Sequence, residues 1–299
     1  MPYRGLTQGL NTLNGGPQNG LKEGLLNGLQ NGLDASAKHF LPETRRYLNA
    51  ILPYCSLSKL QQRAIDRYIR DLFGFANSAY ATYNVWSKLT LLYPFPAGIY
   101  SADRVNLRTP GKYNFTDTLT PTYSQTTRSV AYNGTNNYSN TNFTPNTSST
   151  FAGSNFTSWG FHRVDINSDT NATIGEVGGG NSFAQISTTG KTIVSGAKTV
   201  FSAANSNAIN SCWGIGWPSS GTVKSYFNGT VFSTVSVAYD NTPSRSLLMG
   251  AFNNASPGFG GACTFDFHWE GYGAWSDEEQ KMMYNATKAL KKSFGINWT

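Results

Sequence analysis

Charged residues and cysteines are both scarce in this sequence. Only 13% of its 299 residues are charged, and its three cysteines are the widely spaced Cys55, Cys212 and Cys263. Cysteines this few and this scattered exclude a disulfide scaffold and a clustered zinc site, so we expect buried free thiols. The chain also lacks a run of 18 apolar residues and an apolar segment near its start. We therefore expect neither a membrane-spanning helix nor a signal peptide.

Gly, Asn, Ser and Thr dominate the composition instead. Together they account for 121 residues, and aromatic residues make up 14% of the chain. A chain rich in turn-forming residues disfavours long helices, and an aromatic content this high argues against disorder. The composition predicts an all-β protein with many turns and an aromatic core.

Positive charge is concentrated near the N-terminus. Residues 1–100 carry ten Lys and Arg against five Asp and Glu, and the whole chain has a net charge of +7 and a pI near 9.2. No basic run is longer than the pairs Arg45-Arg46 and Lys291-Lys292, and no zinc, homeodomain or RNP signature is present. We therefore expect no nucleic-acid partner.

The first 36 residues form a low-complexity repeat in which Gly-Leu recurs every four residues. A helix would place these leucines in one stripe, but each interior glycine costs it about 1 kcal/mol relative to alanine. The segment is therefore expected to be ordered only against another molecule. A docking arm and a flexible tail both stay open, and we carry the docking arm forward because a linker needs no regular leucine spacing. Its predicted contact residues are Leu6, Leu10, Leu21, Leu25, Leu29, Leu33, Gly20, Gly24, Gly28 and Gly32.

Three segments are expected to be helical. Apolar residues at three- and four-residue spacing predict an amphipathic helix over residues 56–73. A second short helix is expected over residues 77–91. Near the end, Ser276 and the acidic residues after it begin a helix that runs to about Phe294, with lysines at its negative C-terminal end.

From about residue 93 onward, short alternating runs are separated by Gly, Asn and Pro turns, which is typical of a β-sandwich. Asn228-Gly229 is the strongest hairpin signal, because both central positions of a type I′ turn need a positive φ. The expected strands cover residues 159–166, 191–195, 212–217, 223–227, 231–237, 247–252 and 264–269.

Four segments, in this order and spacing, resemble one family. They are VWSKLTLLYPFPAG (85–98) with VNLRTP (105–110), AYNGTNNYSNTNFTP (131–145), YFNGTVFSTV (226–235) with LLMGAFNN (247–254), and FDFHWEGYGAWSDEEQKMMYNATKALKKSFG (265–295). Together they resemble the concanavalin-A-like, laminin-G-type jelly-roll domain of tailed-bacteriophage virion proteins. The resemblance covers about residues 57–299. It departs from the family at Gly271-Tyr272-Gly273-Ala274-Trp275, where a more regular Gly-x-Gly-Leu is expected.

The resemblance implies a mainly β protein, a concanavalin-A-like jelly-roll sandwich with an extended or helical N-terminal arm and a C-terminal helix. We divide the chain accordingly into a Gly-Leu-rich docking arm (1–55), a helical linker or oligomerisation region (56–92) and a jelly-roll domain with its closing helix (93–299). The resemblance also implies a non-enzymatic virion structural protein, such as a head fibre, capsid decoration or tail component, made in the host cytoplasm. Its expected partners are capsid, portal or tail subunits and further copies of the same chain.

The segment from Thr264 to Glu270 is the best candidate for catalysis. Strand alternation predicts that Asp266, His268 and Glu270 lie on one face. Laminarinase-type glycosidases of this fold carry Glu-x-Asp-x-x-Glu on a strand, and retaining hydrolysis needs two carboxyl groups about 5 Å apart. Because Thr264 stands where the first glutamate is needed, we favour a polar outer face over an aromatic core and expect no catalytic residue. A glycosidase is the least favoured alternative.

Metal binding has little support in the sequence. Domains of this fold often bind Ca²⁺ through clustered carboxylates, and Asp165, Asp169 and Glu176 are the one acidic group close in sequence. We regard this group as insufficient and expect neither a metal site nor a cofactor.

Glycan binding, as in a receptor-binding adhesin of a tail or head fibre, is the main functional alternative. Sugar sites combine an exposed aromatic platform with polar groups that hydrogen-bond to hydroxyls. Seven tryptophans in one sandwich favour a buried role for most of them. The candidate residues are Trp159, His162, Trp213, Trp217 and Tyr239.

Overall fold

The computed structural model describes residues 39–75, 81–144, 157–165, 172–176, 182–186, 191–195, 198–203, 211–219, 221–236, 246–254, 256–258 and 262–298. The helices in these ranges are α3 (Pro42–Ile51), α4 (Lys59–Leu72), α5 (Val85–Lys88), α6 (Tyr100–Asp103) and α7 (Asp277–Ser293).

Strands make up most of the described chain after α5. They are β1 (Leu89–Tyr93), β2 (Thr116–Thr118), β3 (Thr122–Ser124), β4 (Ser129–Tyr132), β5 (Tyr138–Asn140), β6 (Thr157–Asp165), β7 (Ala172–Glu176), β8 (Ser182–Ile186), β9 (Lys191–Ser195), β10 (Lys198–Ala203), β11 (Ser211–Ser219), β12 (Thr222–Phe227), β13 (Thr230–Ser236), β14 (Leu248–Met249), β15 (Phe252–Asn254), β16 (Ser256–Gly258) and β17 (Cys263–Tyr272).

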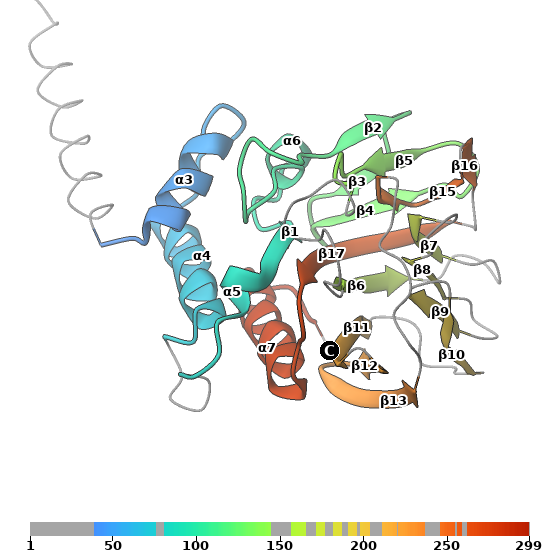
Figure 1. Ribbon diagram of the computed structural model, residues 1–299. Coiled ribbons are helices and arrows are strands. Elements are labelled where there is room, and N and C mark those ends of the chain that lie inside the picture. Colours follow the sequence, from blue (N-terminus) through green and yellow to red (C-terminus); the bar gives the residue numbers. More distant parts are fainter. Residues whose placement is uncertain are drawn as a thin grey trace, which may run out of the picture.

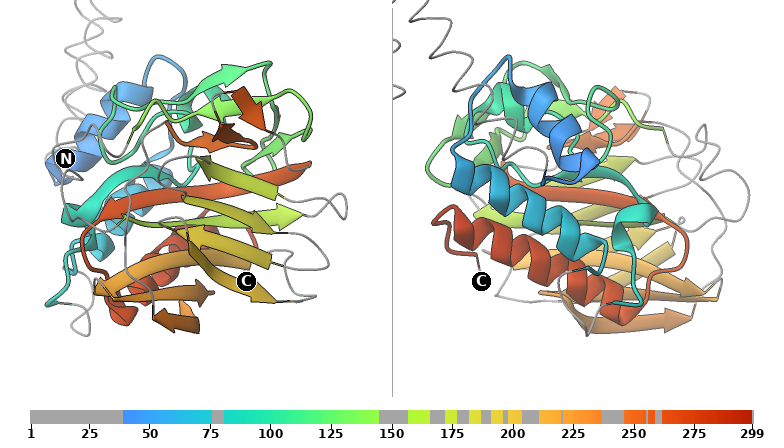
Figure 2. Two further views of the ribbon diagram at one scale, coloured as in Figure 1. Left: turned by 45° about the vertical axis from the view of Figure 1, so that its right-hand side comes forward. Right: turned by 90° about the vertical axis from the view of Figure 1, so that its left-hand side faces the viewer.

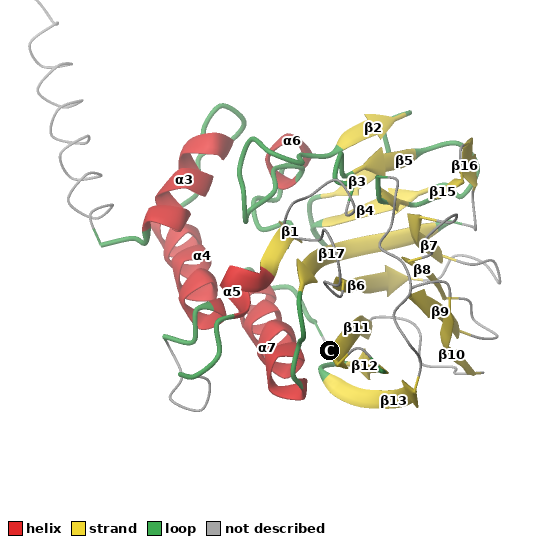
Figure 3. Ribbon diagram, viewed as in Figure 1, coloured by secondary structure: helices red, strands yellow, loops and turns green. Residues whose placement is uncertain are grey.

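These strands form two sheets (Figures 1 and 3). The first sheet has the order β13-β12-β11-β6-β17-β4-β3, and β1 also pairs with β17. The second has the order β10-β9-β8-β7-β14-β5-β2, with β15 and β16 beside β7. Neighbouring strands in both orders run antiparallel where their register is described, and β15 runs parallel to β7. The expectation of a mainly β protein with a C-terminal helix is confirmed.

The first sheet separates two hydrophobic cores. Aromatic side chains such as Tyr93, Phe161 and Trp213 fill the core between the sheets. On the opposite face, the first sheet is covered by α4 and α7, as the right-hand view of Figure 2 shows. The second core lies there and includes Tyr68 and Met283 from these helices together with Trp269 from the sheet.

The helix over 56–73 is confirmed as α4, and the closing helix is confirmed as α7. Each begins with a serine whose side chain accepts a hydrogen bond from the third helical residue, Ser58 for α4 and Ser276 for α7. The two helices pack together, and the hydroxyls of Tyr68 and Thr287 lie 3.1 Å apart. The apolar face of α4 is thus occupied by α7 and by the sheet.

The helix expected over 77–91 is wrong for most of its described residues. Within the described residues, only the four residues of α5 are helical there. From Leu89 the backbone continues as β1 and pairs antiparallel with β17, where Tyr93 lies opposite His268. Pairing with a strand far along the chain decides this local structure, which helical periodicity does not reveal.

The hairpin at Asn228-Gly229 is confirmed. Asn228 has φ +49° and Gly229 has φ +74°, and the two residues join β12 to β13. A β-carbon at Gly229 would lie 2.8 Å from the β-carbon of Tyr284, so the turn packs directly on α7. Two of the three cysteines, Cys212 and Cys263, are buried and form no disulfide, as expected, whereas Cys55 is half-buried.

Candidate functional site

The alternation of side chains between the two faces of the sheet is interrupted partway along strand β17. Its register against β6 slips at Asp266, between Phe265 and Phe267, which is a β-bulge. Phe265 belongs to the core between the sheets, whereas Phe267 belongs to the core under the helices. The prediction that Asp266, His268 and Glu270 share one face is wrong, because the bulge puts Asp266 on the helix side and the other two between the sheets.

Asp266 is the centre of a buried polar cluster under α7. Its Oδ1 lies 2.6 Å from Nδ1 of His162, and its Oδ2 lies 3.2 Å from Nζ of Lys291. The indole N–H of Trp298 donates to the same Oδ1 at 3.3 Å, and the Trp298 ring lies 4.3 Å from the His162 ring. Lys291 also donates to the backbone carbonyl of Asp266 at 2.5 Å. The described polar partners of this carboxylate are therefore side chains of the protein itself, and they hold it in place.

Charge attraction decides the ionisation of this cluster. Burial favours the neutral form of Asp266, but attraction to His162 and Lys291 outweighs burial and holds the pKa of Asp266 below 3.8. Burial also lowers the pKa of Lys291 below 10.5, against the opposing attraction of Asp266. An ionised carboxylate with several buried partners ties the C-terminal end of α7 to the sheet.

His268 and Glu270 lie on the other face, between the sheets. His268 donates from Nδ1 to the carbonyl of Gly160 at 3.1 Å, and its ring stacks on Tyr93 with centroids 6.2 Å apart. Glu270 lies opposite Trp159 in β6, and neither its carboxyl oxygens nor the Trp159 indole nitrogen has a hydrogen-bond partner within the part of the chain that the structure describes. Burial lowers the pKa of His268 to about 4 and raises that of Glu270 well above 4.5. Both side chains are at most 1% exposed, so the expected polar outer face is wrong.

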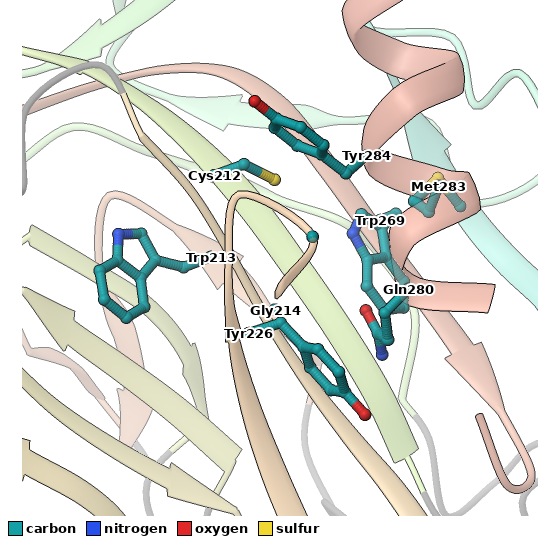
Figure 4. Close-up of a pocket in the computed structure, with 9 residues that line it drawn as sticks. Cys212, Trp213, Gly214, Tyr226, Trp269, Gln280, Met283 and Tyr284 are labelled. Carbon is teal, nitrogen blue, oxygen red and sulfur yellow. The ribbon is translucent and has the colours of Figure 1, made fainter. Parts of the chain in front are cut away.

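Cys212 is the cross-strand neighbour of His162 on the helix side of the sheet. Burial raises the pKa of the Cys212 thiol, which makes it a poor nucleophile. The thiol faces a small cavity of about 10 Å³, enough for one water molecule at most. Figure 4 shows this cavity, with Trp213 pointing away from it to the other side of β11; it is lined by Cys212, Trp213, Gly214, Tyr226, Gly229, Trp269, Gln280, Met283 and Tyr284.

A much larger, open groove lies at the C-terminal end of α7. Its volume is about 600 Å³. We call it the α7 groove and define it by its lining residues, Asn228, Tyr284, Lys288, Lys292, Gly295, Ile296, Asn297 and Trp298. It therefore combines the β12–β13 turn, one side of α7 and the chain that follows α7.

The floor of the α7 groove is aromatic and its rim is polar. Tyr284 and Trp298 stack with centroids 5.4 Å apart at an interplanar angle of 26°, and both are largely buried. Lys288, Lys292 and Asn297 are exposed. The Lys288 ammonium lies 5.5 Å from the centroid of the Tyr284 ring and 3.4 Å from its hydroxyl. The ring of Tyr284 thus positions this ammonium at the groove.

Three of the five residues proposed as a glycan platform are buried. Trp159, His162 and Trp213 are each at most 4% exposed, so they are wrong as surface contacts for a sugar. Trp159 and Trp213 belong to the core between the sheets, whereas His162 lies on the opposite side under Trp298. The side chain of Trp217 and the whole of Tyr239 lie outside the described residues.

Several other predictions also fall outside the described residues. The ten leucines and glycines of the docking arm lie in residues 1–38, and the side chains of Asp165, Asp169 and Glu176 are likewise not described. Within the described ranges, no three His, Cys, Asp or Glu side chains gather closely enough to hold a metal ion. None of the helices described is both long and apolar enough to cross a membrane.

Sequence reasoning missed the α7 groove. The lysines near the end of α7 were explained by the helix dipole alone, and the segment after Gly295 carried no motif. The four-residue spacing of Lys288 and Lys292 was the available signal, because residues at that spacing lie on the same helix face. Nothing in the sequence shows that Asn228 and Trp298 meet them there.

Comparison with known proteins gives a fold and no family. No family model and no curated protein matches the chain. Among solved structures, a mutant of Trypanosoma rangeli sialidase displaying trans-sialidase activity is similar, with 9% identity and a TM-score of 0.50. The match covers 78% of this chain and 39% of that one. An identity this low shows a shared fold only.

Two neurotoxin structures are similar at lower TM-scores. The structure of botulinum neurotoxin type C, whose cell entry depends upon interaction with two ganglioside molecules, has 11% identity and a TM-score of 0.48, covering 68% of this chain and 52% of that one. The binding domain of botulinum neurotoxin DC in complex with SialylT has 11% identity and a TM-score of 0.44, covering 58% and 47%. The chain thus spans about half the length, or less, of each of these three structures.

Proposed function

We propose that this protein is a non-enzymatic carbohydrate-binding domain and that the α7 groove is its binding site. One observation carries the proposal. The groove is an open cavity of about 600 Å³ with exposed amide and ammonium groups at its rim, which are the groups that hydrogen-bond to sugar hydroxyls. The fold shared with part of a sialidase fits a protein that handles sugars.

The geometry argues against hydrolysis by the carboxylates of β17. A retaining glycosidase needs two accessible carboxyl groups about 5 Å apart on either side of the scissile bond. Asp266 lies on one face of the sheet, held by Lys291 and His162, and Glu270 lies on the other. Both are at most 1% exposed, so neither reaches a polysaccharide.

Two side-chain amides in the lining of the α7 groove can hydrogen-bond to a sugar. Asn228 uses its side-chain oxygen to accept from the backbone N–H of Cys212 at 2.9 Å. Its amide nitrogen takes part in no hydrogen bond among the described residues and is available to a ligand. Asn297, also in the lining of the groove, supplies a second, exposed amide.

The experiment is a glycan-array measurement with the full chain. We expect binding to a subset of glycans, weakened by Asn297→Ala, which removes an exposed amide from the groove. Gln125→Ala is the matched control, because Gln125 is an exposed amide on the turn between β3 and β4 and outside the groove. A silent array, or equal loss in both variants, would count against the proposal.

A virion structural role is a second candidate, in which the arm attaches the jelly-roll domain to capsid, portal or tail subunits. The observation in its favour is a set of exposed apolar side chains around the turn between α3 and α4. Leu52 is 63% exposed, Tyr54 49% and Leu60 77%, and an apolar patch of this kind marks protein contacts. Removal of residues 1–36 should then abolish incorporation into particles, and normal incorporation of the truncated chain would refute this role.

A further inference from the structure

We propose that the α7 groove selects acidic glycans, in which the recognised sugar carries a carboxylate or a sulfate. This inference rests on the proposed function and adds the ligand class to it. Its basis is the charge of the groove: Lys288 and Lys292 contribute two ammonium groups, and none of the described lining residues is acidic. An anionic ligand would balance the two positive charges of this lining.

The two lysines are close enough to act together. At a spacing of four residues in α7 they lie on the same helix face, where two like charges repel and destabilise the helix slightly. Neither forms an ion pair with any of the described residues. A bound anion would relieve this repulsion and form charge-assisted hydrogen bonds with one or both ammonium groups.

The helix dipole explains only part of this arrangement. Cations are favoured within the last turn of a helix, which accounts for Lys292. Lys288 lies one turn earlier, and its ammonium is held at Tyr284, 3.4 Å from the hydroxyl. This contact directs the second charge to the groove.

The remaining lining suits the rest of a sugar ring. The amide groups of Asn228 and Asn297 can bind hydroxyls, while Ile296 is half-buried and offers an apolar edge. A small inorganic anion would use the lysines and leave these groups without partners. We therefore commit to a sugar with an acidic substituent as the occupant.

The test compares lactose with two acidic derivatives, sialyllactose and sulfated lactose, by calorimetry on the full chain. We expect sialyllactose, sulfated lactose or both to bind at least about tenfold more tightly than lactose itself, with affinity falling as salt rises. The double variant Lys288→Glu/Lys292→Glu should lose this preference. The conservative pair Lys288→Gln/Lys292→Gln, which removes both charges but keeps a polar side chain at each position, should lose it as well while folding normally.

The control pair is Lys59→Glu/Arg63→Glu, since these exposed residues have the same spacing on α4 and lie outside the groove. It should change the affinity by less than about twofold. Equal binding of lactose and its acidic derivatives would overturn the acidic class but leave carbohydrate binding intact. Absence of binding to every glycan on the array would overturn both. Equally tight binding of inorganic phosphate or of single-stranded DNA would overturn the sugar and identify a general anion site.

Discussion

Nδ1 of His162 lies 2.6 Å from Oδ1 of Asp266, although the two residues are 104 positions apart in the chain. They belong to neighbouring strands, and the bulge in β17 turns Asp266 toward the helices so that the contact forms. Lys291 and Trp298 complete the cluster from α7 and from the segment after it. The α7 groove is built on this cluster, because Trp298 is both a partner of Asp266 and part of the groove lining.

Asp266→Ala should destabilise the protein by about 3–5 kcal/mol, because it leaves the buried ammonium of Lys291 without its counter-ion. Urea unfolding at neutral pH measures this loss. Since the pKa of Asp266 is lowered in the folded protein, its contribution is present above pH 3.8 and is lost as the pH falls below that value. The exposed Glu278 gives the control Glu278→Gln, expected to change stability by less than about 0.5 kcal/mol.

Glu270→Gln should stabilise the protein by about 1–3 kcal/mol at neutral pH, because burial penalises a charged carboxylate that has no hydrogen-bond partner among the described residues, and an amide does not ionise. Its pKa is raised by burial, so the cost of charging it appears as the pH rises. The wild type should therefore lose stability relative to this variant as the pH rises above about 4.5. A variant that proved clearly less stable than the wild type would show that Glu270 has a partner in the folded protein.

Asp103 should make stability fall as the pH rises from about 4 to about 6. Burial raises its pKa to about 6, although the hydroxyl of Tyr123 and the backbone N–H groups of Ala97 and Gly98 donate to it. A raised carboxyl pKa means that stability is fully present below the unfolded value and is lost as the pH rises through the folded value. The expected change is roughly 2–3 kcal/mol.

Asp103→Asn tests this, because an amide does not titrate. The variant has one acceptor fewer and is expected to be less stable at every pH, so the informative quantity is the slope of unfolding free energy against pH. That slope should become flatter between pH 4 and 6. An unchanged slope would show that other groups produce the pH dependence.

Gly160→Ala should destabilise the sandwich by about 1–3 kcal/mol or more. A β-carbon there would lie 2.5 Å from Nε1 of Trp269 and 2.6 Å from the carbonyl oxygen of Trp213, and the carbonyl belongs to the backbone of β11 and does not move freely. Gly221→Ala is the matched control, because a β-carbon at Gly221 meets nothing within 4 Å. Thermal unfolding compares the two, and equal midpoints would refute the close packing of Trp269 on β6.

Local patterns in the sequence are enough to predict several elements. The capping serines and apolar spacing of α4 and α7, and the turn at Asn228-Gly229, all depend on residues within a few positions of one another. Composition likewise predicts the β-rich class. The same reasoning fails for the length of α5. The helix ends where β1 begins, and the residues of β17 that pair with β1 lie more than 170 positions further along the chain.

The candidate site depended almost wholly on the tertiary structure. Alternation assigned Asp266 and Glu270 to one face, and a single bulged residue separated them. Trp159 and Trp213, two of the aromatic residues chosen for a sugar platform, are buried because they fill the core between the sheets. The sequence by itself determined which segments could become helices, strands and turns, since those choices are made over a few residues. Only the tertiary structure decided which polar groups meet and which reach solvent, because the free energies of burial and of charge pairing arise between residues far apart in the chain.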